Sequence, residues 1–223
     1  MQSSAVGTPF TPSAPSRAPM RFARRIARSA LALPVGALVW LACFLLMERP
    51  VHAIGDHTAV ELRQLDYAGG HADPRPNATK RLAWEVRQRT SVETRLESTH
   101  VRFSDATVYD SPLLYFSGDR PFPPFSEAEV QGFRRFVDFG GFVIIDDASP
   151  EESGFDGSVR REVTRAFGPR GLARLDTKHV LYRSFYLVPR PLGRVEGVDY
   201  LEGVERAGRL AVVYSRHDLG GAY

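Results

Sequence analysis

Hydrophobic residues recur with two different periods along residues 60–214, and the changes of period predict strands alternating with helices. Spacings of three or four residues predict helices at 78–89, 126–139 and 157–167, the last with Asp156 as its N-cap. Short apolar or alternating runs predict strands at 60–65, 90–94, 101–103, 113–116, 142–145 and 210–214. Two further apolar segments, 172–176 and 182–188, follow the third helix, and we expect Tyr182, Phe185 and Tyr186 to be core residues.

The stretch from Ser126 to Asp147 carries the strongest local signals. Ser126 and Glu129 have the spacing of a capping box, in which each side chain satisfies a backbone N–H at the start of a helix. The buried stripe of this helix is formed by Val130, Phe133, Phe136 and Val137. Gly140 is placed to end the helix in a left-handed turn. The apolar strand 142–145 that follows ends in two carboxylates, Asp146 and Asp147.

This order of elements predicts an α/β fold with three layers, in which helices cover both faces of a mainly parallel sheet. We assign it to residues 54–223 as one domain, because a chain of this length and 43% apolar content can bury one good core.

Residues 1–53 have the features of a targeting segment. A Ser/Pro/Ala-rich run precedes Met20, which is the better candidate for the true start, and arginines then precede the uncharged, mostly apolar segment 30–47. Cleavage after Ala53 would make this a signal peptide. Without cleavage, eighteen residues at about 1.5 Å each would form a membrane anchor. Both alternatives place the following domain in the periplasm or on the outer face of the inner membrane.

The net charge of +3 comes from this leader. Residues 1–53 contain six of the 29 basic residues and one of the 26 acidic ones, so residues 54–223 carry 23 basic and 25 acidic residues, a net charge of −2. A mildly acidic domain has no basic field to attract a phosphate backbone, and we expect no nucleic-acid partner.

Polar residues follow several of the predicted parallel strands. Because ligands collect at the carboxyl ends of such strands, we expect these residues to meet along one edge and to contact a ligand. The expected ligand-binding residues are Asp119, Arg120, Asp146, Asp147, Ser215, Arg216 and Asp218. Adjacent strand residues point to opposite faces, so only one of Asp146 and Asp147 should enter a shared pocket. The other should cap a helix or accept from Arg160 or Arg161.

The candidates for catalytic chemistry are Asp146, His179 and His217. A serine hydrolase would pair one of these histidines with Ser117 or Ser149, but no G-x-S-x-G turn supports it. His179 precedes an apolar run, and a histidine at such a position is more often a packed, hydrogen-bonded ring than a catalytic base. The histidines lack H-x-H or H-E-x-x-H spacing, and we expect no metal and no cofactor.

Several long strings resemble bacterial proteins of the domain of unknown function 4159 family, among them LLYFSGDRPFPPFSEAE, GGFVIIDDAS, SGFDGSVRRE and YSRHDLGGAY. The resemblance covers nearly all of residues 58–223. It implies a fold like that of class I glutamine amidotransferases, an exported or membrane-tethered protein, and partners among MoxR-type ATPases and von Willebrand factor A-like proteins. His217 and Tyr223 stand where relatives tend to have Asn and Trp. Relatives also continue beyond Tyr223, so the resemblance leaves open a C-terminal truncation.

A class I amidotransferase needs a cysteine nucleophile, and the single cysteine here, Cys43, lies in the apolar leader segment. Glutamine hydrolysis is therefore excluded unless another nucleophile substitutes. Our first hypothesis is a non-catalytic envelope module that binds a ligand or partner segment. The alternatives are a hydrolase that uses Asp, His or Ser at the strand ends, and a purely structural partner of an ATPase complex.

Overall fold

A computed structural model describes residues 59–152 and 154–222 of the chain. The expected leader, 1–53, with its apolar segment 30–47, lies outside these ranges. Within them, no helix is both long and apolar enough to span a bilayer.

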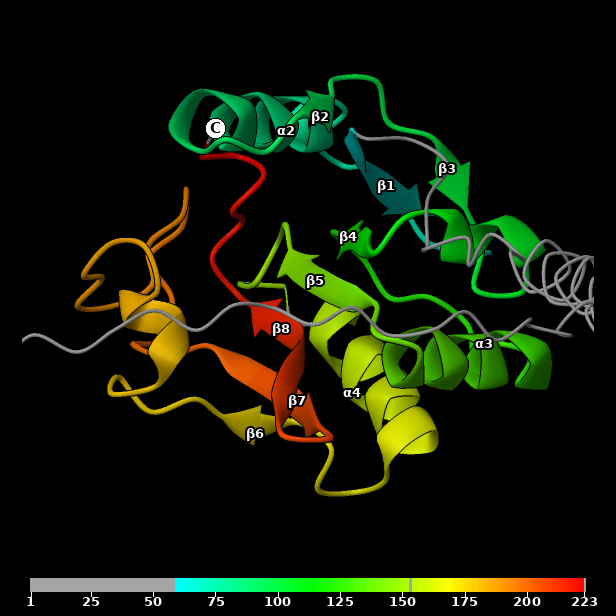
Figure 1. Cartoon of the computed structure of the whole chain (residues 1–223). Coiled ribbons are helices and arrows are strands. Elements are labelled where there is room, and N and C mark those ends of the chain that lie inside the picture. The colour runs from blue at the N-terminus through cyan, green and yellow to red at the C-terminus, as the bar shows by residue number, and fades with distance from the viewer. Residues whose placement is uncertain (1–58, 153, 223) are drawn as a thin grey trace, which may run out of the picture. The chain divides into compact units, whose positions relative to one another are not determined.

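The domain is built on a mixed, mainly parallel sheet in the order β2-β1-β4-β5-β8-β7-β6, with β3 also paired to β1 (Figure 1). Strands β1, β2, β3, β4, β5 and β8 run parallel, whereas β7 is antiparallel to both of its neighbours. The strands are β1 (Val60–Leu65), β2 (Thr94–Arg95), β3 (His100–Val101), β4 (Leu113–Gly118), β5 (Phe142–Asp147), β6 (Ala173–Arg174), β7 (Glu202–Arg206) and β8 (Arg209–Ser215).

Helices lie on both faces of this sheet. In Figure 1, α2 (Ala78–Arg89) lies on one side of the strands, and α3 (Glu127–Asp138) and α4 (Gly154–Phe167) lie on the other. Alternate residues of β4 divide between the two faces: Tyr115 packs with Ala78 of α2, whereas Phe116 belongs to the larger cluster that includes Phe133 and Val159. The 3-10 helices η1 (Ala106–Asp110) and η2 (Val180–Arg183) lie in connections. The α/β class, the parallel central strands and the helices on both faces are thus as predicted.

The α3 signals are confirmed in detail. Ser126 Oγ accepts from the backbone N–H of Glu129, and the Glu129 carboxylate accepts from the backbone N–H of Ser126 at 2.8 Å. Gly140 has φ +106°, a left-handed conformation that a side chain resists, so the chain turns there into β5.

Several sequence expectations were wrong. Of the predicted strands 90–94 and 101–103, only Thr94 and Val101 lie in strands, in β2 and β3. Helix α4 begins at Gly154, so Asp156 lies inside its first turn, where its carboxylate binds Arg160 and the Tyr214 hydroxyl instead of capping the helix. Phe185 and Tyr186 are 61% and 55% exposed, and only Tyr182 of that segment is buried. The strand β7 was missed because its sequence, Glu-Gly-Val-Glu-Arg, is too polar for an apolar-run signal.

Candidate functional site

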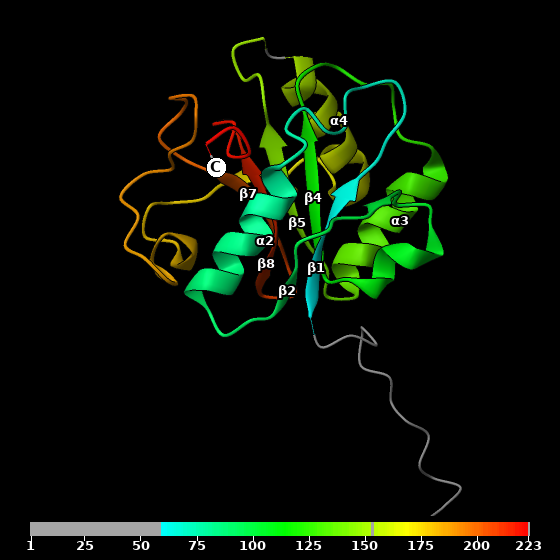
Figure 2. The same ribbon diagram turned by 90° about the horizontal axis from the view of Figure 1, so that it is seen from above.

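The carboxyl ends of β4, β5 and β8 form one edge of the sheet. Ser117 pairs with Asp146, Gly118 pairs with Asp147, and Asp146 pairs in turn with Ser215. Figure 2 shows the arrowheads of β1, β4 and β5 pointing to this edge, with the C-terminal segment beside it. The structure therefore brings together the residues that follow these strands. We call this edge, with the loops that follow its strands, the carboxyl rim.

Asp146 is the centre of a buried hydrogen-bond network on the α2 face. Its Oδ2 accepts from the Tyr115 hydroxyl at 2.6 Å and from the Gly220 N–H at 2.8 Å, and its Oδ1 accepts from the Leu219 N–H at 2.9 Å. Burial raises the pKa of this carboxyl, although these three donors oppose the shift. Asp146 thus anchors the segment after β8 to β5.

Asp147 points to the opposite face and is less well satisfied. Its Oδ1 accepts from the Ser149 N–H at 3.0 Å, while its Oδ2 is buried and has no hydrogen-bond partner among residues 59–152 and 154–222. Burial raises the pKa of this carboxyl to about 6, and the nearby Asp156 and Asp146 charges add to the shift.

We expected Arg160 or Arg161 to donate to one of the two carboxylates, Asp146 or Asp147, and this expectation is wrong. Arg160 binds Asp156 and Glu202, and Arg161 binds Glu162 and the Phe122 carbonyl. Each guanidinium is thus engaged by acids of α4 or β7 and does not contact Asp147.

Ser215 and His217 form a buried pair, with both side chains at most 1% exposed. Nε2 of His217 lies 2.7 Å from the Val198 carbonyl, which can only accept, so Nε2 carries a proton. Nδ1 of the same ring lies 3.0 Å from Ser215 Oγ. Both ring nitrogens therefore have protein partners, and neither the serine nor the histidine is accessible to a substrate.

Asp218 is also fully buried and is held by two arginines. Arg75 contacts both of its carboxylate oxygens, at 3.1 and 2.7 Å, and Arg194 Nε contacts Oδ2. The backbone N–H of Asp218 donates to the carbonyl of Asp147, and Asp218 has φ +51°. Asp218 therefore links three segments of the chain: the loop before α2, the loop around Arg194 and the end of β5.

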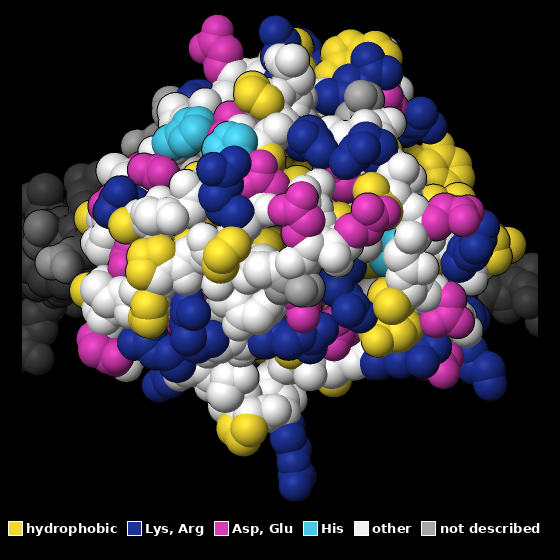
Figure 3. Space-filling model, turned by 180° about the vertical axis from the view of Figure 1, so that it is seen from behind, with side chains coloured by type: hydrophobic (Ala, Val, Ile, Leu, Met, Phe, Trp, Pro, Cys, Tyr) yellow, Lys and Arg dark blue, Asp and Glu magenta, His cyan; other side chains and the backbone are white. Residues whose placement is uncertain are grey.

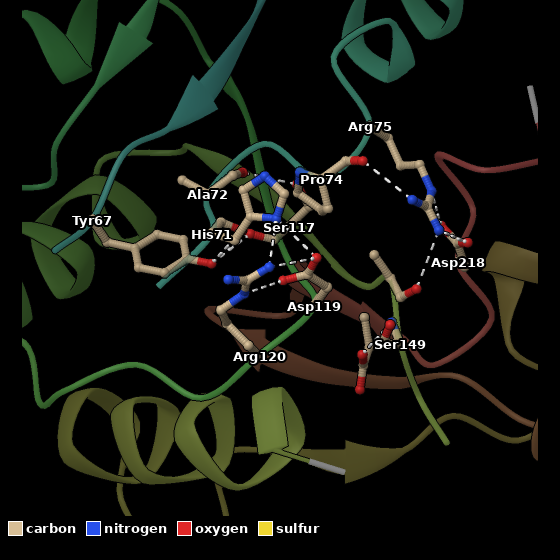
Figure 4. A network of polar contacts seen from close by, with 12 residues as sticks. Tyr67, His71, Ala72, Pro74, Arg75, Ser117, Asp119, Arg120, Ser149 and Asp218 are labelled. Atoms are coloured by element: carbon tan, nitrogen blue, oxygen red, sulfur yellow. Dashed lines mark hydrogen bonds and ion pairs between the residues drawn. The ribbon is translucent and has the colours of Figure 1, made fainter. Parts of the chain in front are cut away.

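The exposed part of the carboxyl rim includes a polar triad of His71, Asp119 and Arg120 (Figure 4). Asp119 lies 2.8 Å from both His71 Nδ1 and Arg120 Nε, and Figure 4 shows the three side chains facing one another. Partial burial favours the neutral acid, but the hydrogen bonds from Arg120 and His71 outweigh it and lower the pKa of Asp119. Asp119 is therefore a stable anion beside two donors.

Packed polar groups support this triad from below. Gln64 and Ser117 both donate to the carbonyl of Ala72, and the Tyr67 hydroxyl donates to the Ser117 carbonyl at 2.8 Å. Ser117 is thus a structural donor and does not contact a histidine. His71 is held at the rim through the main chain of its neighbour Ala72.

Arg216 and His179, two of the predicted residues, lie apart from the triad. Arg216 donates to the Tyr200 hydroxyl at 3.1 Å and lies 3.7 Å from Glu202. His179 caps η2 by accepting from the Leu181 N–H, and its Nε2 lies 3.4 Å from Glu205. Because Glu205 pairs with Leu210, near the start of β8, His179 belongs to the end of that strand farther from the carboxyl rim.

Three rim residues were missed by sequence reasoning: His71, Arg75 and Arg194. The signal for the first two was available, since the loop 66–77 follows the parallel strand β1 and must reach the same edge as the other strand ends. Arg194 had no such signal. Its loop is held at the rim by long-range contacts, among them the backbone bonds from Arg194 N–H to the Asp218 carbonyl and from Val195 N–H to the His217 carbonyl.

The exposed chemistry of the carboxyl rim is that of charge pairs. In the two described ranges, no group of three or more His, Cys, Asp or Glu side chains is arranged to hold a metal ion. On the face shown in Figure 3, lysine and arginine side chains lie among acidic ones. Such an arrangement suits recognition of a small charged ligand better than a long polyanion.

Comparison with known proteins gives a family. Residues 61–223 match the model described as Domain of unknown function (DUF4159). The chain belongs to this family. The match covers every residue of the carboxyl rim named above. No curated protein matches the chain.

Proposed function

We propose that this chain is an exported or membrane-tethered domain of the cell envelope that binds a ligand or partner segment at the carboxyl rim without catalysing a reaction. One observation carries the proposal: the candidate catalytic groups at the strand ends are buried and bonded to the protein itself. Asp146 and His217 are at most 1% exposed, and each has all of its polar side-chain atoms engaged.

The accessible groups support recognition instead of catalysis. His71, Asp119 and Arg120 offer an anion and two donors at the protein surface, and partly solvated ion pairs of this kind contribute to specificity and orientation. A nucleophile would need an adjacent base and an approach for substrate. Ser215 has the base but no exposure.

The leader and the scaffold support the location and the ancestry that we propose. An arginine-rich segment before the apolar residues 30–47 is typical of an export signal or anchor. We take the fold to be a class I glutamine amidotransferase-like scaffold that lacks the cysteine nucleophile, since residues 54–223 contain no cysteine. Such a domain would serve as a binding partner, for example within a MoxR-type ATPase and von Willebrand factor A-like complex.

Site-specific cross-linking in cells tests this proposal. A photoreactive amino acid replaces Arg120, whose side chain is 58% exposed at the rim, and a matched variant carries it at Arg174, which has the same exposure on the edge strand β6. We expect a discrete adduct from position 120 that is absent from position 174. Equal patterns at both positions, or none at either, would contradict binding at the rim.

A hydrolase remains the second candidate because of Asp147. A carboxyl with a pKa of about 6 and a free oxygen has the protonation behaviour of an acid or base catalyst at neutral pH. Its complete burial is the reason that we rank this function second.

An activity panel separates the two candidates. Activated esters, amides and phosphoesters are offered to the intact chain and to the Asp147→Asn variant. Our first proposal predicts no turnover by either protein. Turnover that is lost in Asp147→Asn, while the fold is retained, would establish the hydrolase.

A further inference from the structure

A surface pocket of about 370 Å³ lies beside the carboxyl rim, between the start of α2 and the segment after β8. Three arginines line it, Arg75, Arg81 and Arg194, together with the backbone of Gly220 and Gly221. No acidic side chain is among its lining residues. A concave site with several guanidinium groups and no opposing carboxylate at its surface attracts anions.

The arginines are only partly neutralised by the protein. Asp218 lies beneath the pocket, fully buried, and contacts both Arg75 and Arg194. Arg194 uses only its Nε for this contact, and within the part of the chain that the structure describes its two terminal nitrogens have no protein partner. Arg81 contacts Glu85 through one nitrogen, at 3.1 Å, and is 51% exposed. Several N–H donors therefore remain for a ligand.

Asp218 also orients the donors before a ligand arrives. Its two oxygens hold the Arg75 guanidinium at 3.1 and 2.7 Å, and this interaction is the main reason that the pKa of Arg75 is raised. Side chains that are already ordered lose less conformational entropy on binding. The buried Asp218 carboxylate therefore holds two arginines in place at the wall of the pocket, where they are preorganised to bind an anion.

Gly221 allows the ion pair between Asp218 and Arg194 to form at the wall of the pocket. A Cβ at Gly221 would lie 2.5 Å from Asp218 Oδ2 and 2.8 Å from Arg194 Nε, so any side chain there would disturb this ion pair. Asn77 and Ala78, at the start of α2, also line the pocket, and the first turn of α2 contains no acidic residue. The partial positive charge of this helix end adds to the field of the arginines.

We infer that this pocket binds a small organic anion through a phosphate or carboxylate group held by Arg81 and Arg194. The inference rests on the proposed binding function and names its ligand class. The volume is within the range of small-molecule sites and too small for a folded partner. Phosphate and carboxylate each present two oxygens that can accept a bidentate pair of hydrogen bonds from a guanidinium. The experiment therefore has one arm for each anion.

The test uses the detergent-solubilised full chain at low ionic strength, with inorganic phosphate and succinate as separate probes and chloride as the reference anion. Calorimetry measures affinity. In a Trp40→Phe background, Trp84 is the only tryptophan, and its fluorescence reports on the pocket because the Arg81 guanidinium lies 4.4 Å above its ring. We expect saturable binding of at least one probe, which identifies the phosphate or the carboxylate arm, and a change in Trp84 emission.

Two variants and a control locate the site. Arg81→Gln and Arg194→Gln should each weaken binding at least tenfold, whereas Arg102→Gln, a half-exposed arginine paired with Asp66, should leave it unchanged. Circular dichroism confirms that each variant is folded. No saturation by either probe, or equal affinity in all three variants, would overturn the inference. The Arg120 cross-link would survive that result, so the failure of this site is distinguishable from failure of the proposed function.

Discussion

Asp146 and Asp147 are neighbours at the end of β5, yet their carboxylates lie on opposite faces of the sheet. They also differ in how many of their oxygens accept hydrogen bonds. Asp146 accepts three hydrogen bonds and holds the segment 218–221 in place. Asp147 accepts one, from Ser149, and keeps a buried oxygen without a partner among the described residues. Burial raises the pKa of both carboxyls, but only Asp146 has donors to both of its oxygens and so anchors another segment of the chain.

Replacing Asp146 with alanine should destabilise the domain. The substitution removes the acceptor of the Leu219 and Gly220 backbone N–H groups, and each buried unsatisfied donor costs about 1–3 kcal/mol. We expect a loss of roughly 3 kcal/mol or more in the free energy of unfolding, measured by urea denaturation. Asp146→Asn, which keeps an oxygen acceptor, should lose less. A loss below about 1 kcal/mol for the alanine variant would contradict the anchoring role.

Replacing Asp147 with asparagine should stabilise the protein at neutral pH. The folded-state pKa of about 6 lies above the ordinary value of 3.8, so the native state binds the extra proton between these values and stability falls as pH rises through that window. At pH 7 the gain should approach about 3 kcal/mol, from about 1.4 kcal/mol for each pH unit of the shift.

The pH dependence is the control for this prediction. The difference between Asp147→Asn and the parent chain should shrink as pH falls below 6 and be small by about pH 4, where the folded-state carboxyl is protonated and the unfolded-state carboxyl, with its ordinary pKa of 3.8, is partly so. Unfolding midpoints measured from pH 4 to pH 8 check it. A gain that is constant over this range would rule out titration of Asp147 as the cause.

Two helical glycines should respond to alanine in opposite directions. A Cβ at Gly132 in α3 would lie 1.9 Å from the backbone oxygen of Phe103, so Gly132→Ala must push two elements apart and should cost several kcal/mol. A Cβ at Gly157 in α4 meets nothing within 4 Å. Gly157→Ala should therefore raise the free energy of unfolding by up to about 1 kcal/mol. Thermal denaturation of the pair tests the packing of α3 against the chain before η1.

The cap of α3 gives a smaller effect. Ser126→Ala removes the acceptor for the Glu129 N–H, and loss of such a cap costs about 1 kcal/mol. Ser104→Ala is the matched control, because Ser104 is exposed and, among residues 59–152 and 154–222, its hydroxyl contacts only its neighbour Asp105, at 3.5 Å. Denaturant midpoints should fall for Ser126→Ala alone. Equal midpoints would show that the helix start is held by packing.

Local chemistry along the chain was sufficient to predict the main elements. The bounds of α2 agree with the predicted 78–89, and the start of α3 follows Ser126 as the capping box requires. These features depend on residues three or four positions apart, or on a single φ angle as at Gly140, so they are encoded within one turn of chain. The parallel order of β4 and β5 follows from the same information, since a helix between two strands returns the chain to the same end of the sheet.

What each strand end touches depended on tertiary contacts. The sequence determined that Asp119, Asp146 and Asp218 follow strands. It could not determine that Asp146 meets Gly220, that Asp218 meets Arg75 and Arg194, or that Asp119 alone of these three carboxylates is partly exposed. These partners are separated from one another by 24 to 143 residues, and burial decides which carboxylates are exposed. Burial and long-range pairing are properties of the packed chain, because they arise only when several segments exclude water together.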